Sequence, residues 1–475
     1  MNILLTGANG YIGKRLLINL IAENHHVFCI VRDKLRFSKE LAEEKNVSLI
    51  QLDFNDISNC EIPENIDVAY YLIHSMSSDK DYSKIEANCA KNFNNLLSKT
   101  KVKQVIYLSG ITNVSNLSKH LNSRKNVEGL LKSKNYSLTT LKAGIIIGSG
   151  SASFEIIRDL VEKLPVMIAP KWLNTRCQPI AIRDVLSILL KAKGKKTLYN
   201  KSLDIGGPDI LTYKEMLLEF ANIRNLKRRI FIVPVMTPRL SSYWLYFVTS
   251  TSYYLAIALV NSMKIEVVCS KDQLDINKEL NIHPVSYEKA LKLAFERIDH
   301  NLVISSWKDS YSSSRLNSEQ IRNDFVVPSF GCYKDVKFRE IESLNSTKEK
   351  LWNIGGKNGW YYGNKLWKIR GWFDKLIGGV GLRRGRTNQD KIEIGDSLDF
   401  WRVLYADESR ERLVLYAEMK LPGEAWLEFK IENKKLIQTA TFRPKGLLGR
   451  LYWKSVIPFH YFIFNGMINN LSKNN

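Results

Sequence analysis

Three glycines near the start of the chain have the spacing of a phosphate-binding turn. Gly7, Gly10 and Gly13 follow a short apolar run at residues 2–6 and precede an apolar helical pattern that begins near Lys14. Such glycines allow a tight turn, a close approach of the backbone to a pyrophosphate, and close packing of helix on sheet. N–H groups at the start of the helix then face the phosphates. The residues expected to hold a dinucleotide here are Thr6, Gly7, Asn9, Gly10, Tyr11, Ile12 and Gly13.

The end of the second apolar run bears on the choice of cofactor. Residues 27–31 form a strand pattern that is followed by Arg32 and Asp33. An arginine at this position accommodates the 2′-phosphate of NADP, whereas a carboxylate binds the ribose hydroxyl of NAD. Arg32 therefore favours NADP(H), and the adjacent Asp33 leaves NAD(H) open.

Two further strand patterns end in polar side chains. Residues 47–52 lead to Asp53 and Phe54, where the carboxylate could accept a hydrogen bond from the adenine or could cap a turn. The pattern at 66–74 ends with Leu72, Ile73 and His74, on the edge that faces the cofactor in an open parallel sheet. His74 could contact the cofactor or substrate, or could be a structural hydrogen-bonding group.

The next strand pattern, at residues 105–110, contains Ser109. Strands and helices alternate up to this point with the spacing of βαβ units. This alternation predicts an α/β fold with a doubly wound parallel sheet, the Rossmann type.

Taken together, these segments resemble the atypical, extended-like branch of the short-chain dehydrogenase/reductase family, including the NmrA-like proteins and the accessory subunit of respiratory complex I. The matching stretches are residues 6–13, Asp53, 108–110, 141–148 with Lys142, 178–185 and 205–208. The resemblance covers about the first 300 residues. It implies NAD(P) binding, with Ser109 and Lys142 at the cofactor, and a small substrate lobe mainly at 149–297.

The chain departs from that family at its catalytic pair. Active members carry Tyr-x-x-x-Lys, and the resemblance aligns His120 and Arg124 with these two positions. Arginine can hydrogen-bond a ribose, but it is too firmly protonated to act as an acid or base. His120 could exchange a proton near neutral pH, although an exposed position on a helix is the favoured interpretation. The candidate catalytic residues are Ser109, which would orient a substrate oxygen, His120 and Arg124.

The expected substrate lobe contains small and aromatic residues rather than clustered charges. Residues 149–153 predict a flexible loop beside the nicotinamide, and Trp172, Phe231 and the stretch 243–260 indicate either an apolar pocket or simply core. A bulky, apolar substrate is therefore favoured over a sugar nucleotide.

A serine-rich stretch separates this region from a differently built C-terminal part. We expect a first domain at 1–304, a linker at 305–330, and a second domain at 331–475. Strand patterns at 397–405, 412–420, 425–431 and 436–442 precede a helix at about 451–471. This part resembles a domain of unknown function, and the pattern indicates a START-like (SRPBCC) helix-grip fold. Such a fold would enclose an apolar cavity for a lipid or quinone, unless aromatic side chains fill it.

The overall composition limits partners and compartment. The net charge of +22 fits phosphate-bearing cofactors or an anionic membrane face, and no nucleic-acid module is present in the sequence. Six scattered cysteines lack metal-ligand spacing, so we expect no metal site and a reducing compartment. Without a secretory signal pattern the cytoplasm is expected. The stretch 243–260 indicates a buried or interfacial helix pair, or membrane association.

Three functions remain open from the sequence. The first is an NADPH-dependent oxidoreductase that acts on a hydrophobic carbonyl or quinone-like substrate. The second is a non-catalytic NADP(H)-binding redox sensor or an accessory protein of a respiratory complex. The third is a lipid-binding protein at a membrane surface.

Overall fold

The computed structural model describes residues 1–34, 37–55, 61–74, 82–113, 117–233, 257, 260–299, 327, 332–356, 358–377, 379–381, 392, 394–444 and 446–473. The chain divides into two compact units, Met1–Tyr311 and Ser312–Asn475. The two units are described separately below. The expected linker at 305–330 and almost all of the stretch 243–260 lie outside the described residues, so their predicted roles are not addressed by the structure.

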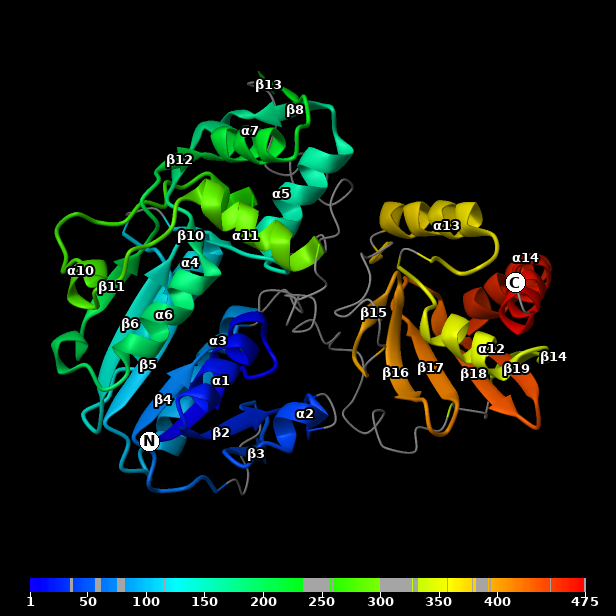
Figure 1. Ribbon diagram of the computed structural model, residues 1–475, viewed down its shortest axis with the longest axis horizontal. Helices are drawn as coiled ribbons and strands as arrows, with labels where there is room; N and C mark the ends of the chain where they lie inside the picture. The colour runs from blue at the N-terminus through cyan, green and yellow to red at the C-terminus, as the bar shows by residue number, and fades with distance from the viewer. Residues whose placement is uncertain are drawn as a thin grey trace. The chain divides into compact units, whose positions relative to one another are not determined.

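The first unit contains a seven-stranded parallel sheet with the order β11-β6-β5-β4-β1-β2-β3 (Figure 1). Its strands are β1 (Asn2–Thr6), β2 (His26–Val31), β3 (Val47–Gln51), β4 (Val68–Tyr71), β5 (Gln104–Gly110), β6 (Ser137–Ala143) and β11 (Ser202–Ile205). The predicted doubly wound parallel sheet is confirmed. Every residue of β4 is buried, as expected for a strand covered on both faces.

Helices cover the two faces of this sheet with separate apolar cores. On one face, α1 (Tyr11–Ala22) and α6 (Ile182–Ala192) contribute Leu16 and Ile188 to one core. On the other face, α3 (Tyr82–Leu97) and α4 (Lys119–Leu130) contribute Phe93 and Val127 to another. The short α2 (Lys39–Ala42) and α10 (Ile276–Glu279), with the 3-10 turn η3 (Lys196–Leu198), complete this part of the unit.

A smaller lobe follows the sheet in sequence. Its elements are β7 (Ile146–Ile147), α5 (Ala152–Lys163), β8 (Val166–Pro170), η2 (Lys171–Asn174), β9 (Arg176–Cys177), β10 (Ile180–Ala181), β12 (Leu211–Thr212), α7 (Tyr213–Ile223), β13 (Arg229–Val233) and α11 (Tyr287–Asp299). Trp172 is buried in the core of this lobe, edge-on to Tyr213 at 6.1 Å between ring centroids. Phe231 is 55% exposed. Trp172 was expected to line an apolar pocket or to be a core residue, and it is a core residue. Phe231 lies on the surface.

The second unit is built on a six-stranded antiparallel sheet with the order β14-β19-β18-β17-β16-β15. The strands are β14 (Tyr333–Glu340), β15 (Ser397–Leu398), β16 (Trp401–Asp407), β17 (Arg412–Ala417), β18 (Gly423–Glu432) and β19 (Lys435–Pro444). The helices are α12 (Leu344–Trp352), α13 (Asn364–Leu376) and α14 (Gly446–Ser472). Three of the four expected strands are confirmed as β17, β18 and β19. The single strand expected at 397–405 is instead the two antiparallel strands β15 and β16, and β14 is an additional edge strand.

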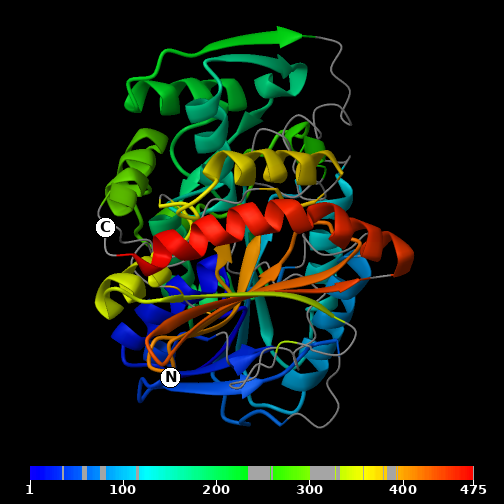
Figure 2. The same ribbon diagram turned by 90° about the vertical axis from the view of Figure 1, so that its right-hand side faces the viewer.

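The long α14 lies across one face of this sheet, with α13 beside it (Figure 2). Trp453 of α14 stacks on Phe442 of β19 with 5.5 Å between ring centroids, and on Tyr333 of β14 at 5.8 Å. The predicted final helix is therefore present and begins five residues before Leu451. Among the helices that the structure describes, none is both long and apolar enough to cross a membrane.

Candidate dinucleotide site

The glycine turn after β1 is built so tightly that side chains would not fit. Gly7 has φ +68°, and an added Cβ would lie 2.8 Å from the carbonyl oxygen of Leu72 at the end of β4. A Cβ on Gly13 would lie only 2.1 Å from the carbonyl oxygen of Gly7. Both glycines are therefore required by close backbone contacts and, at Gly7, by a left-handed conformation.

The start of α1 suits an anion. Gly10 occupies the N-cap position without a side-chain cap, and its own N–H donates to the carbonyl oxygen of Gly7 at 2.8 Å. The first turn of α1 contains no acidic residue. N–H groups in the first turn of a helix have no acceptor within the helix and carry the positive end of its dipole. This cradle thus fits the pyrophosphate of a dinucleotide.

The other expected cofactor residues follow strands of the same edge. The sheet reverses its order at β1, which lies between β2 and β4, and ligands bind outside the carboxyl ends of strands at such a switch. The exposed Arg32 follows β2 here, and Leu72, Ile73 and His74 follow β4. The exposed Asp53 follows β3. One of its carboxylate oxygens accepts the N–H of Asn55 at 2.9 Å, so this side chain caps a turn, as the second of its two expected roles required.

The side chains of two expected cofactor residues make contacts within the protein instead. The Thr6 hydroxyl donates to the carbonyl oxygen of Tyr70 at 3.0 Å and accepts the N–H of Leu72 at 3.1 Å. It thereby joins the ends of β1 and β4. Phe54 is buried and packs edge-on against Phe93 at 5.8 Å. Any contact of Phe54 with a cofactor would have to come from its backbone.

A buried carboxylate joins the end of β4 to α4. Glu86 of α3 lies 2.9 Å from His74 Nδ1, and it accepts a hydrogen bond from Ser123 Oγ. Burial alone would raise the pKa of Glu86, but the hydrogen bond with His74 and the charge of Arg124 lower it. Glu86 is thus an ionised carboxylate with defined partners inside the first unit.

His74 and His120 form a pair of neutral imidazoles. Their ring centroids are 5.3 Å apart, and His120 Nδ1 is buried with no hydrogen-bond partner in the described part of the chain. Burial and the charge of Arg124 lower the pKa of His74 to about 4. Burial and the neighbouring His74 likewise lower the pKa of His120 well below its usual value. The ring of His120 is half-buried, so the favoured interpretation as an exposed helix residue is wrong, because α4 turns it toward His74.

Ser109 and Arg124 lie on neighbouring elements of this edge. Ser109 Oγ is buried at the end of β5 and has no hydrogen-bond partner among the described residues. A Cβ on the adjacent Gly110 would touch Leu121 at 3.1 Å, so β5 ends against the start of α4. Arg124 is buried, and its carbonyl oxygen accepts the Tyr107 hydroxyl at 3.4 Å. The strand that carries Ser109 therefore ends against the helix that carries His120 and Arg124, and the catalytic roles of these three residues remain predictions.

Lys142 is next to Ser109 in the sheet but is held by carboxylates. It pairs in register with Ser109 of β5 and with Asp204 of β11, and its ammonium lies 3.6 Å from Glu128 of α4. Burial raises the pKa of Asp204, whose carboxylate accepts the N–H of Ser270 at 2.9 Å. These contacts fix α4 against β6, and binding of a cofactor by Lys142 remains a prediction.

The expected flexible loop at 149–153 is instead held in place. Arg15 of α1 donates to the carbonyl oxygen of Ser149 at 2.9 Å. Ser151 Oγ caps α5 by accepting the N–H of Phe154 at 3.2 Å and donates to the carbonyl oxygen of Ile146 at 3.0 Å. The small residues therefore serve as a helix cap and an arginine-binding turn.

Glu86 was not among the residues expected from the sequence, although a signal for it exists. In α3, Glu86 lies in the same helical row as Cys89, Ala90 and Phe93, all of which are buried. A carboxylate at spacings of three, four and seven from apolar positions predicts a charge on a core-facing stripe. Such a charge requires a partner, because burial without one is costly.

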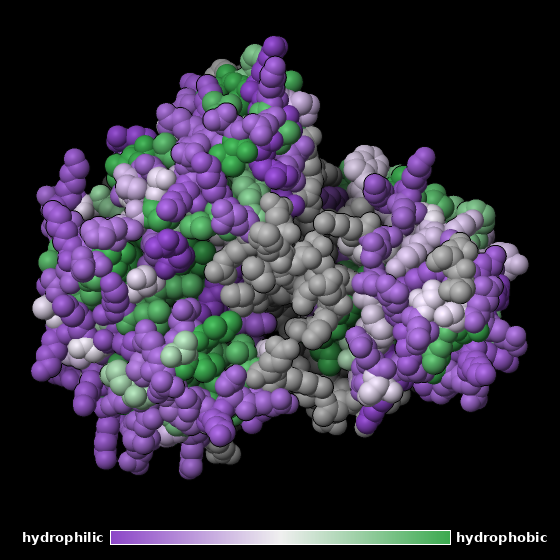
Figure 3. Space-filling view, in the orientation of Figure 1, coloured by the Kyte–Doolittle hydropathy of each residue, from purple (hydrophilic) through white to green (hydrophobic). Residues whose placement is uncertain are grey.

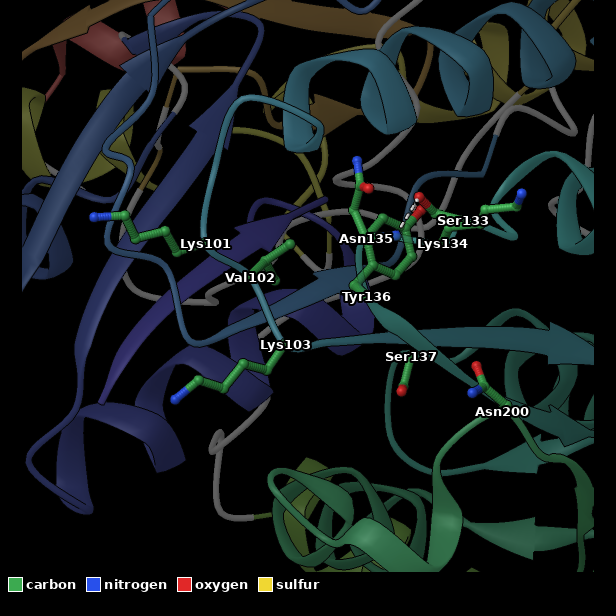
Figure 4. Close-up of a pocket in the computed structure, with 9 residues that line it drawn as sticks. All are labelled: Lys101, Val102, Lys103, Ser133, Lys134, Asn135, Tyr136, Ser137 and Asn200. Carbon is green, nitrogen blue, oxygen red and sulfur yellow. Dashed lines mark hydrogen bonds between the residues drawn. The ribbon is translucent and has the colours of Figure 1, made fainter.

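A separate open depression lies at the amino ends of β5 and β6, whereas the glycine turn lies at the carboxyl ends of the strands. Its volume is about 610 Å³, and it is lined by Lys101, Val102, Lys103, Ser133, Lys134, Asn135, Tyr136, Ser137 and Asn200. Its three lysine side chains extend in different directions rather than converging (Figure 4). It shares no residue with the glycine turn. Among the described residues, no group of histidine, cysteine and acidic side chains could hold a metal ion.

Comparisons with known proteins agree with this division of the chain. Residues 7–149 match a family described as NAD(P)H-binding, and residues 332–467 match one described as Protein of unknown function (DUF2867). A search of curated proteins gave no match.

Several solved structures also resemble the chain. A UDP-glucuronic acid 4-epimerase from Bacillus cereus in complex with NAD is 16% identical, over 63% of this chain and 97% of that chain, with a TM-score of 0.47. A UDP-glucose 4-epimerase from Thermotoga maritima with UDP-glucose is 18% identical, over 64% and 100%, with a TM-score of 0.48. A nucleoside-diphosphate-sugar epimerase from Staphylococcus aureus is 16% identical, over 62% and 100%, with a TM-score of 0.48.

The glycine cradle, the parallel sheet and the family match point the same way. The chain carries an NAD(P)H-binding Rossmann domain, followed by an antiparallel domain that matches a family of unknown function.

Proposed function

We propose that the first unit binds NADP(H) and exchanges hydride with a hydrophobic carbonyl or quinone-like substrate. The observation that carries this proposal is the position of Ser109 near the carboxyl end of β5, at the same ends of the strands as the glycine cradle. Its hydroxyl is buried and has no hydrogen-bond partner among the described residues. A bound nicotinamide would supply or accept the hydride. The residues around Ser109 would bind and orient the substrate oxygen.

Proton transfer to the substrate oxygen must differ from that in enzymes with a Tyr/Lys pair. Burial and the neighbouring His74 lower the pKa of His120 well below its usual value, so the imidazole is neutral at neutral pH and is a weak base. When an alcohol is oxidised, a water would therefore take the proton, and His120 would orient that water or the substrate oxygen by a hydrogen bond. In the reductive direction a water would donate the proton, while the Ser109 hydroxyl donates a hydrogen bond to the substrate oxygen. Arg124 would bind a ribose hydroxyl or a substrate oxygen as a permanent cation.

Glu86 would act as a positioning residue for this group. Through its contacts with His74 and Ser123 it joins the end of β4 to α4. This contact fixes the helix that carries His120 and Arg124. The preference for NADP(H) rests on Arg32, exposed at the end of β2, where a 2′-phosphate would lie.

A second candidate is a non-catalytic NADP(H)-binding protein, such as a redox sensor or an accessory subunit. It is favoured by the replacement of the Tyr-x-x-x-Lys pair with His120 and Arg124, neither of which is a proton donor at neutral pH in this structure. For the second unit we propose a helix-grip arrangement, supported by α14 lying along an antiparallel sheet.

The proposal is tested by NADPH oxidation with a panel of hydrophobic aldehydes, ketones and quinones. Ser109→Ala should lower kcat/KM about tenfold or more, because a hydrogen bond to a developing charge is worth about 1.5–3 kcal/mol. The matched control is Ser137→Ala at the amino end of β6, which should leave kcat/KM unchanged. NADPH affinity, measured by calorimetry, should be similar in the wild type and Ser137→Ala.

The outcomes separate the two candidates. Equal turnover in Ser109→Ala and the wild type would exclude Ser109 from the reaction. Tight NADPH binding without oxidation by any acceptor would favour the non-catalytic protein. Absence of NADPH binding would contradict both.

A further inference from the structure

The second unit contains an apolar cavity between its sheet, α13 and α14. Its volume is about 390 Å³, within the range of small-molecule sites, which is about 300–1,000 Å³. The interior walls include Trp367 of α13, Trp401 of β16, Phe442 of β19 and Trp453 of α14, each less than 10% exposed. These walls are mainly apolar and suit a hydrocarbon. The polar atoms Trp367 Nε1, Trp401 Nε1, Trp426 Nε1 and His460 Nδ1, which belong to lining residues, are buried without a hydrogen-bond partner among the described residues.

The cavity opens between the two helices. Leu366, Ile369 and Phe373 of α13 and Phe459 of α14 line the cavity, yet they are 36%, 51%, 53% and 61% exposed. Residues that both line a hollow and face solvent define its mouth. The mouth is therefore made of large apolar side chains, with the half-buried guanidinium of Arg370 also lining the cavity.

Apolar side chains continue outward from the mouth along both helices. On α13 and just after it, Trp372, Leu376 and Ile377 are 55%, 48% and 54% exposed. On α14, Leu448, Leu451, Phe459 and Phe462 share one side of the helix at its period of 3.6 residues, and they are between 56% and 74% exposed. Figure 3 shows hydrophobic side chains at the surface around α13. Contiguous exposed apolar surface of this kind marks a docking face.

The charges on these helices identify what docks there. The cations Lys365 and Lys368 of α13 and Arg450 and Lys454 of α14 are exposed on these two helices. The sequence of α14 has no acidic residue, and the single one in α13, Asp374, is buried and accepts backbone N–H groups of Gly381 and Lys420. Aromatic and aliphatic side chains among cations, without exposed acids, suit the interface of an anionic bilayer.

We propose that α13 and α14 dock the second unit on an anionic membrane surface and that the cavity between them takes up a hydrocarbon chain of one membrane lipid. The apolar mouth would lie against the acyl region, so the chain would pass into the cavity without crossing water. The cations would remain at the headgroups. This inference does not depend on hydride transfer by the first unit.

Docking is tested on the full-length protein with vesicles of phosphatidylcholine, with and without phosphatidylglycerol. Wild-type protein should sediment with the anionic vesicles at low salt and much less at high salt. Trp372→Glu should weaken this binding about tenfold or more, since it removes an inserted side chain and adds a repelled charge. The control is Phe338→Glu on β14, where Phe338 is 59% exposed but belongs to neither helix.

Uptake of a chain is tested by fluorescence quenching with brominated acyl chains. In Trp372→Phe the remaining tryptophan emission should still be quenched, because Trp367, Trp401 and Trp453 line the cavity. Ala440→Phe, which fills the cavity wall, should reduce this quenching. Should Ala440→Phe not fold, extraction and mass analysis of lipid retained by wild-type protein replaces it. No sedimentation with anionic vesicles, equal loss in Trp372→Glu and Phe338→Glu, or neither quenching nor retained lipid would overturn the proposal.

Discussion

The two units offer candidate ligand sites of opposite chemistry. In the first unit, ionised groups with defined contacts lie near the carboxyl ends of the strands. An example is Glu86, which contacts His74 and Ser123. The cavity of the second unit is walled by tryptophan and phenylalanine, and its titratable lining residues are Arg370 at the mouth, Tyr452 and His460. A charged, hydrogen-bonding ligand fits the first, and an uncharged hydrocarbon fits the second.

The second unit also contains buried charges, so the apolar character of its cavity is a local property. Arg402 and Glu418 form a buried ion pair there with an N–O distance of 3.0 Å, and Arg402 also donates to the carbonyl oxygen of Gly395. Neither residue of this pair lines the cavity. This buried ion pair thus lies away from the space between α13 and α14.

The largest effect is expected from Gly13→Ala, which tests the glycine cradle alone. The added Cβ would lie 2.1 Å from the Gly7 carbonyl oxygen, so the turn must shift. NADPH affinity, measured by calorimetry, should fall about a hundredfold, or roughly 2.7 kcal/mol. The control is Gly129→Ala in α4, where an added Cβ meets nothing within 4 Å. Unchanged affinity in Gly13→Ala would contradict the proposed cradle.

A smaller effect, on stability, is expected from His460→Phe in the apolar hollow. Burial lowers the pKa of His460 from 6.5 to about 4, so the folded state keeps it neutral while the unfolded state takes up a proton. The stabilising contribution is complete above pH 6.5 and is lost as the pH falls toward 4. We expect a loss of about 1–2 kcal/mol, below the ceiling of about 3.5 kcal/mol for 2.5 pKa units, because His460 is only half-buried and solvent screens its charge.

The measurement is thermal unfolding of wild type, His460→Phe and Tyr461→Phe between pH 7 and about pH 4. The wild type and Tyr461→Phe should lose stability in parallel as the pH falls. His460→Phe should lose less over the same range. Parallel curves for all three proteins would show that His460 is not held neutral in a dry wall.

The smallest effect is expected from Arg32→Ala, which sharpens the choice of cofactor. Loss of an exposed cation beside the 2′-phosphate should weaken NADPH binding about tenfold, or roughly 1.4 kcal/mol, and NADH binding much less. Lys34→Ala, a nearby exposed cation, serves as the control. Equal weakening of both cofactors would remove Arg32 from the 2′-phosphate site.

The sequence predicted the first unit well because its signals are local. The glycine spacing, the apolar run of β1 and the strand-end residues all lie within short segments. The Glu86 contacts with His74 and Ser123 join residues 12 and 37 positions apart, and no periodicity shows which partners a buried carboxylate finds. His120 was misjudged for the same reason, because α4 is polar on most of its surface and shows no apolar stripe.

In the second unit, the sequence patterns predicted the strands better than the position of the cavity mouth. The strand β14 was missed because its eight residues include five charged ones and it pairs only with β19, at the edge of the sheet. The cavity was an expectation from the fold, but its mouth between α13 and α14 depends on how two helices pack on the sheet. Helical periodicity alone does not give that packing.

The central claim is that the chain has two separate ligand sites of opposite polarity. Native mass spectrometry of the gently purified full-length protein, followed by release and identification of the bound molecules, tests it most directly. We predict NADP(H) and a lipid on the wild type, and loss of the cofactor but not of the lipid in Gly13→Ala. A wild-type protein without NADP(H), or loss of both molecules in Gly13→Ala, would contradict the account.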